Sequence, residues 1–243
     1  MRPMQLLAIE TSTEYCSCAL LIDGRVAESH VLAGHTHSDI LLPTVARLMS
    51  EAGLGFAQLD CVAFGAGPGS FTGLRIACGV AQGLAFGHDL PVVPVVSLES
   101  LAEQSDADAV ITAFDARMGE LYLAAYQRVG GDWHAVLAPQ LVVAPVSSAE
   151  LPDLPQAEWI GAGSGFGSHG AALTLRYAPL RVDARGMPRA AAIATIAARK
   201  FARGETVAAE HALPLYLRDK VALDVHEQAA LRERQRVLRE VAA

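Results

Sequence analysis

One glycine-rich stretch constrains the fold more than any other part of the chain. It begins as an apolar strand at 59–64, continues as the turn Gly65-Ala66-Gly67-Pro68-Gly69 and leads into a helix that opens near Ser70. Glycines permit positive φ and close backbone approach, and the first amides of a helix lack partners within it. The sequence therefore predicts a strand, turn and helix that either face an anion or pack tightly against a neighbouring element.

Two nucleotide-binding motifs can be compared with this turn. A P-loop requires a lysine and a hydroxyl residue directly after its second glycine, whereas here the turn continues into Thr72-Gly73-Leu74-Arg75 without a lysine. A dinucleotide fingerprint follows the first strand and has a third glycine, but this turn follows a later strand and Thr72 takes that glycine's place. A packing turn and an anion site both stay open, with Gly67, Gly69 and Ser70 as the candidate anion contacts in this turn.

Composition limits the class of protein. With 243 residues, of which 52% are hydrophobic, the chain can bury the core of one large domain or two small ones. Its formal charge of −7 argues against a broad surface that tracks phosphates, so we expect any nucleic acid to be held through a partner. No apolar run approaches the length of about 20 residues that spans a bilayer, and residues 1–10 lack the layout of a signal peptide. We expect a cytoplasmic protein that does not bind membranes.

The cysteines and histidines do not indicate a metal site. Cys16, Cys18, Cys61 and Cys78 contain no C-x-x-C pair and fall in predicted strands and one helix, which is typical of small buried hydrophobes. The histidine pair His35 and His37 lacks a nearby third ligand, and we expect it to cap or hydrogen-bond.

Hydrophobic patterning predicts an opening β-meander over 6–25 and an amphipathic helix over 38–52, with Ser38 as N-cap and Gly53 as stop. After a strand at Val62, a second helix runs over 70–86. Its face is smooth, because Gly79, Gly83 and Gly87 recur at every fourth position. Glycine within a helix costs up to about 1 kcal/mol, so something must approach this face closely. The chain's own sheet or first helix is one interpretation, and another subunit is the alternative.

The second half repeats this plan in outline. A short strand at 92–96 precedes a helix capped by Ser97-Leu98-Glu99-Ser100, and a second meander occupies 109–137. Further on, the sequence predicts a strand and glycine turn at 159–167, a helix at 190–201, a closing strand at 214–218 and a helix at 227–242. The repetition predicts an internal duplication at a spacing of roughly 100 residues. We divide the chain into domains at 1–103 and 104–218, whose final helix could return to the first domain, and a helical tail at 219–243.

Five segments together resemble the TsaB (YeaZ) family over about residues 4–223. They are Ala8-Ile9-Glu10-Thr11-Ser12, His37-Ser38 with Leu41-Leu42-Pro43, the stretch from Gly65 to Arg75, Asp115-Ala116-Arg117-Met118-Gly119-Glu120 with Tyr122 and Tyr126, and Pro214-x-Tyr216-x-Arg218. The resemblance implies an α/β protein of the actin-like ASKHA fold, with two duplicated domains that each hold a mixed five-stranded sheet flanked by helices.

The resemblance also implies a function. Family members take part in forming threonylcarbamoyladenosine next to the anticodon of tRNAs that read ANN codons. They are the non-catalytic partners of a threonylcarbamoyltransferase paralogue, TsaD, and a small ATPase, TsaE, joins them, so tRNA is reached through the complex. The paralogue binds its metal through two histidines, and the corresponding positions here are Ser97 and Leu101, which cannot supply imidazole ligands. We therefore expect no catalytic residues and no metal.

ATP-using members of this fold have an aspartate at the first turn, whereas this chain has Glu10, followed by Thr11 and Ser12. The longer carboxylate is expected to crowd a magnesium site, so we expect no cofactor and at most weak ADP or ATP binding. In the predicted inter-domain cleft, Asp115, Arg117 and Glu120 stand where a phosphate-binding glycine pair is expected. We predict that Arg117 and Glu120 pair with each other or with the opposing domain.

In the family, the first two helices pack against the same helices of the paralogue, or against a second copy in a homodimer. Carried onto this chain, that interface consists of Leu41, Val45, Leu48, Leu74, Arg75, Gly79 and Gly83. Two other functions are alternatives. A small-molecule kinase of this fold would need Glu10 and Asp115 as its carboxylates, and a metallopeptidase would need the absent metal ligands.

Overall fold

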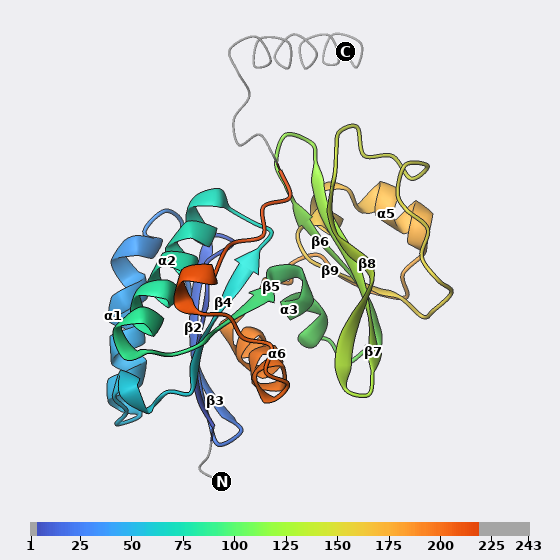
Figure 1. Ribbon diagram of the computed structural model, residues 1–243. Coiled ribbons are helices and arrows are strands. Elements are labelled where there is room, and N and C mark those ends of the chain that lie inside the picture. The colour runs from blue at the N-terminus through green and yellow to red at the C-terminus, as the bar shows by residue number, and fades with distance from the viewer. Residues whose placement is uncertain (1–3, 219–243) are drawn as a thin grey trace.

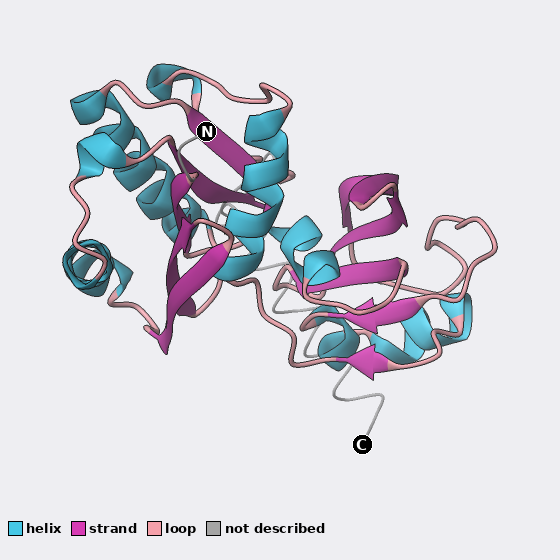
Figure 2. Ribbon diagram, turned by 90° about the horizontal axis from the view of Figure 1, so that it is seen from below, coloured by secondary structure: helices cyan, strands magenta, loops and turns pink. Residues whose placement is uncertain are grey.

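The computed structural model describes residues 4–218, which form two α/β halves side by side (Figure 1). Each half is built on a five-stranded mixed sheet with helices packed against it (Figure 2). The strand order β3-β2-β1-β4-β5 of the first sheet returns as β8-β7-β6-β9-β10 in the second. The predicted α/β class and the predicted internal duplication are therefore confirmed.

The first sheet joins the opening meander to two strands parallel to β1. Its strands are β1 (Gln5–Glu10), β2 (Tyr15–Ile22), β3 (Arg25–Leu32), β4 (Cys61–Gly67) and β5 (Val92–Val96). Successive side chains of a strand point to opposite faces. In β1, Leu7 and Ile9 belong to the core on one face and Leu6 and Ala8 to the core on the other. A strand covered on both faces carries a continuous apolar run, as β1 does from Leu6 to Ile9.

Helices α1 (His37–Glu51) and α2 (Phe71–His88) cover one face of the first sheet, and α6 (Ala190–Ala202) covers the other (Figure 1). Short 3-10 turns, η1 (Phe56–Gln58) and η2 (Ala209–His211), lie beside α2. The small alanine side chains of α6 let that helix lie close to the strands. The sequence predicted all three helices to within two residues at each end.

The second sheet consists of β6 (Ala109–Asp115), β7 (Leu121–Val129), β8 (Asp132–Val142), β9 (Ile160–Ala162) and β10 (Val182–Asp183). Helix α3 (Ser97–Glu103) packs on one face, and α4 (Gly165–Ser168) and α5 (Gly170–Tyr177) pack on the other. Two helices pack against the domain on the other side of the expected boundary at residue 104. Helix α3 joins the second core, while α6 returns to the first sheet. The division itself stays a prediction.

Three local expectations are wrong. Helix α1 has Thr36, not Ser38, at its N-cap. Val96 is the N-cap of α3, because the Ser97 hydroxyl is hydrogen-bonded to a distant carboxylate instead. Residues 212–218 form no strand and run without regular secondary structure from α2 to the second domain. The expected helix at 227–242 lies outside the described residues. Among the helices of 4–218, none is long and apolar enough to cross a membrane.

Candidate functional site

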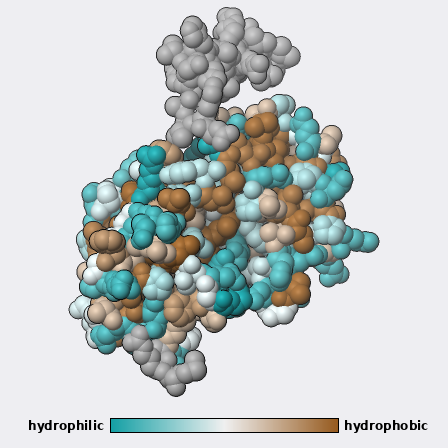
Figure 3. All heavy atoms as spheres, viewed as in Figure 1, coloured by the Kyte–Doolittle hydropathy of each residue, from teal (hydrophilic) through white to brown (hydrophobic). Residues whose placement is uncertain are grey.

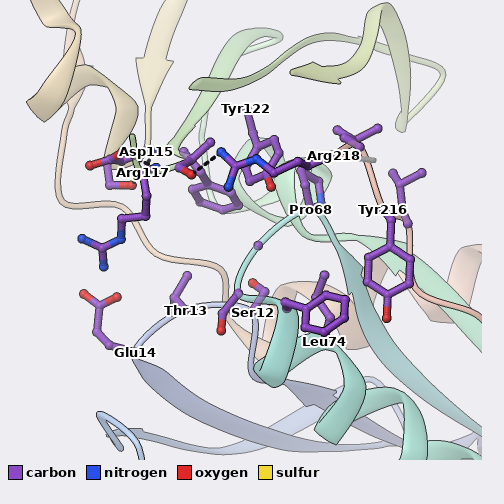
Figure 4. Close-up of a pocket in the computed structure, with 18 of the residues that line it drawn as sticks. Ser12, Thr13, Glu14, Pro68, Leu74, Asp115, Arg117, Tyr122, Tyr216 and Arg218 are labelled. Atoms are coloured by element: carbon purple, nitrogen blue, oxygen red, sulfur yellow. Dashed lines mark hydrogen bonds between the residues drawn. The ribbon is translucent and has the colours of Figure 1, made fainter. Parts of the chain in front are cut away.

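A cavity of about 440 Å³ lies between the two domains, where the turn after β4 meets the end of β6 (Figure 4). Of the predicted anion contacts, Ser12, Gly69 and Ser70 line this cavity. Glu10, Thr11 and Gly67 do not. From the second domain, Asp115 and Arg117 line it, whereas Glu120 lies outside the lining. The structure therefore brings together only part of the predicted set, and weak nucleotide binding stays a prediction.

The Glu10 carboxylate is directed into the protein rather than into the cavity. Glu10 is 1% exposed, and its Oε1 accepts a hydrogen bond from the Ser12 backbone N–H at 2.5 Å. Its Oε2 accepts one from the Ser97 hydroxyl at 2.8 Å. Glu10 therefore does not project into the cleft, where it was expected to crowd a magnesium site. Its carboxylate instead joins β1 to α3 inside the protein. This placement also removes one of the two carboxylates that a kinase would need in the cavity.

Burial raises the pKa of the Glu10 carboxyl above 4.5, although its hydrogen bonds to Ser12 and Ser97 act in the opposite direction. A raised pKa in the folded state means that folding favours the protonated form. The resulting stability is fully present below pH 4.5 and is lost as the pH rises through the folded-state pKa.

Glu10→Gln keeps the shape of the side chain and removes this titration. We therefore expect the free energy of unfolding of the variant, relative to the natural chain, to increase between about pH 4.5 and about pH 8. Urea unfolding of both proteins at the two pH values measures this difference. A difference that does not change with pH would show that the Glu10 carboxyl does not titrate as a buried group.

The glycine-rich turn packs directly against the turn after β1. The Ser70 N–H donates to Ser12 O at 2.7 Å, and the Thr11 hydroxyl donates to Gly73 O at 2.7 Å. A Cβ at Gly69 would lie 2.5 Å from Ser12 O, and one at Gly73 would overlap Thr11 O. These contacts support the packing interpretation of the turn, because the glycines are needed for backbone contact within the chain.

Arg117 and Glu120 do not pair with each other. Glu120 forms an ion pair with Arg218, which also donates to Ala116 O at 2.8 Å. The Arg117 N–H donates to Asp115 Oδ1 at 2.8 Å, and its guanidinium points toward Glu14 of the opposing domain (Figure 4). The sequence motif Pro214-x-Tyr216-x-Arg218 therefore supplies the partner of Glu120, and sequence reasoning did not connect the two.

Four residues of the expected partner interface are buried. Leu41, Val45 and Leu48 are at most 4% exposed and pack in the first core, and Leu74 is 2% exposed. The apolar stripe of an amphipathic helix packs against its own sheet, so these side chains cannot form a surface contact in this conformation. Arg75, Gly79 and Gly83 are exposed on α2, as an interface requires.

The glycines of α2 are not explained by packing among residues 4–218. A Cβ added at Gly79, Gly83 or Gly87 meets nothing within 4 Å. The interpretation that they allow close approach of the chain's own sheet or first helix is therefore wrong. On the same helix Phe86 is 78% exposed, and on α1 Leu42 is 50% exposed. Sequence reasoning missed both, although each stands off the buried stripe of its helix. We call Arg75, Gly79, Gly83, Phe86 and Gly87 the α2 face.

Other predicted side chains occupy structural positions. Cys16, Cys18, Cys61 and Cys78 are buried, as predicted. His37 is 7% exposed and its Nε2 lies 3.2 Å from Tyr15 O, which confirms its hydrogen-bonding role. Leu101 belongs to the second core. Within residues 4–218, no three His, Cys, Asp or Glu side chains gather in a way that could hold a metal ion.

Two duplicated α/β domains with a cavity between them define a protein of the actin-like fold. The family model of the tRNA N6-adenosine threonylcarbamoyltransferase TsaD matches residues 30–162. The tRNA threonylcarbamoyladenosine biosynthesis protein TsaB of Escherichia coli (strain K12) is 40% identical over 90% of this chain and 96% of its own. Its counterpart in Haemophilus influenzae is 35% identical, and that match covers 91% of this chain and 96% of the relative.

Among solved structures, YeaZ from Pseudomonas aeruginosa superimposes with a TM-score of 0.80 at 40% identity. That match covers 88% of this chain and 100% of the other. The chain therefore belongs to the TsaB family.

Proposed function

We propose that this chain is a non-catalytic scaffold that binds and activates a TsaD-type threonylcarbamoyltransferase during formation of threonylcarbamoyladenosine on tRNA. The relatives named for that pathway support the substrate class. The α2 face supports the mode of action, because its glycines are exposed with open space beside them and its Phe86 is an exposed apolar side chain. In this proposal a TsaE-type ATPase and the tRNA are engaged through the complex, and a second copy of the chain takes the α2 face when the partner is absent.

The observation that carries the proposal is the row of exposed glycines in α2. Each lowers the stability of a free helix by up to about 1 kcal/mol. No neighbour among residues 4–218 fills the space beside Gly79 or Gly83. A helix of another protein packed at close range would use that space, since short interaxial distances require small residues at the contact.

Reconstitution tests the activating role. The TsaD-type enzyme, threonylcarbamoyl-adenylate and an ANN-decoding tRNA are combined with and without this chain, and modified adenosine is quantified. We expect transfer to depend on the chain. Equal transfer in its absence would overturn the proposal, and a complex without added transfer would reduce the chain's role to binding.

A further inference from the structure

The C-terminal segment 205–218, called the strap here, ties the two domains together after α6 ends (Figure 1). It first extends the edge of the first sheet, where Val207 and Val92 exchange backbone hydrogen bonds of 2.9 Å. It then follows α2, where Ala212 O accepts from Cys78 Sγ at 3.1 Å and from Gln82 Nε2 at 2.9 Å. The first part of the strap is therefore fastened to the helix that carries the α2 face.

At the N-terminal end of α2 the strap reaches the molecular surface. The Arg75 Nε donates to the Tyr216 hydroxyl at 3.2 Å, and the Tyr216 ring lies 5.4 Å from that of Phe71. The Arg75 guanidinium lies 3.8 Å above the Phe71 ring. Tyr216 is 44% exposed and Leu213 is 67% exposed, and hydrophobic atoms lie among hydrophilic ones on this side of the molecule (Figure 3). A protein bound to the α2 face would therefore adjoin Arg75 and Tyr216.

Two residues later the strap enters the second domain. Leu217 packs against the second core. Arg218 donates to Ala116 O and forms an ion pair with Glu120, and both side chains of that pair are about four-fifths buried, at 19% and 20% exposure. Only Leu217 separates Tyr216 from Arg218 in the chain, so the contact with α2 and the contact with the turn 116–120 lie within three consecutive residues.

The turn 116–120 contributes Ala116 and Arg117 to the cavity wall and has an unfavourable backbone conformation. Arg117, Met118 and Gly119 have φ values of 66°, 55° and 79°, a left-handed run that is unfavourable for the two residues with side chains. The turn closes on itself through Ala116 N–H to Glu120 O and Glu120 N–H to Arg117 O, each 3.0 Å. Arg218 is bonded to both ends of this turn, and so holds it in the conformation that directs Arg117 toward Glu14.

We propose that the strap couples occupancy of the α2 face to the turn 116–120. A TsaD-type partner on the α2 face restricts Arg75 and Tyr216, and the strap thereby orders the turn through Arg218. This regulation rests on the proposed function, since it names that partner as the occupant. Arg75, Tyr216 and Arg218 are positioning residues in this scheme and contact no reacting group.

Amide hydrogen exchange of the full chain tests the coupling in two windows, 72–87 and 114–122. In the free protein we expect Arg218→Ala to speed exchange in 114–122 several-fold and to leave 72–87 unchanged. Tyr216→Phe, which keeps the ring and removes the acceptor of Arg75, should give a smaller increase in 114–122. Arg176→Ala is the control, because it breaks an exposed ion pair with Asp153 elsewhere in the second domain.

When a TsaD-type protein is added, amide exchange of the natural chain should slow in both windows. In Arg218→Ala it should slow only in 72–87. Protection of 72–87 without any change in 114–122 in the natural chain would overturn the coupling and leave the proposed function standing. No protection of 72–87 would overturn the proposed function and, with it, the partner's role in the coupling. Unchanged exchange of 114–122 in free Arg218→Ala would overturn the strap's role independently of any partner.

Discussion

Gly83→Trp is expected to lower the affinity of this chain for a TsaD-type partner by about 100-fold, which corresponds to about 2.7 kcal/mol. A Cβ at Gly83 meets nothing within 4 Å in the described part of the chain, so the indole can point into solvent without disturbing the fold. In a complex, the same indole would occupy the space that a closely packed helix requires. Size-exclusion chromatography and a binding titration with the purified partner measure the loss.

Two further variants separate the interface from the fold. Gly167→Trp places the same side chain on α4 of the second domain, where a Cβ also meets nothing within 4 Å, and binding should be retained. Gly83→Ala should stabilise the free chain by up to about 1 kcal/mol, because alanine favours a helix more than glycine does. If Gly83→Trp binds the partner as tightly as the natural chain, the α2 face is not the interface.

Regular elements could be predicted from the sequence because each depends on its own local pattern. The alanine-rich stretch at 190–201 forms α6 (Ala190–Ala202), and the repeated meander predicts the internal duplication that the matching strand orders of the two sheets show. Periodicity locates a buried stripe and the glycines or caps that end it. It does not show which later segment packs on which sheet, so the return of α6 to the first sheet was left open.

The candidate site was predicted less well, because its contacts join residues far apart in the chain. Ser97 looked like a helix cap, yet its hydroxyl is bonded to Glu10, 87 positions earlier. The sequence predicts that Glu120 pairs with Arg117 or with the opposing domain, but its partner is Arg218, 98 positions later. On α1, the apolar stripe was assigned to a partner although it covers the chain's own sheet. The glycines of α2 were recognised as an unusual pattern, and only the space around them showed that they face outward.

Gly73→Ala is expected to destabilise the chain by about 3 kcal/mol, since overpacking at a rigid contact costs about 1–3 kcal/mol. Its new methyl would overlap the backbone oxygen of Thr11, whose own hydroxyl donates to Gly73 O. Neither side of this contact is a flexible side chain, so both turns must shift apart. Urea unfolding of the full chain at one pH measures the loss.

Gly79→Ala, less than two helical turns further along the same helix, is the matched control and should have the opposite sign. A methyl there meets nothing within 4 Å, so only the gain in helix propensity of up to about 1 kcal/mol remains. The two substitutions change the same atoms in one helix, and the difference between them reports what lies beside each glycine. Equal destabilisation by both would mean that Gly79 is required within the fold, and the argument that its space is reserved for a partner would fail.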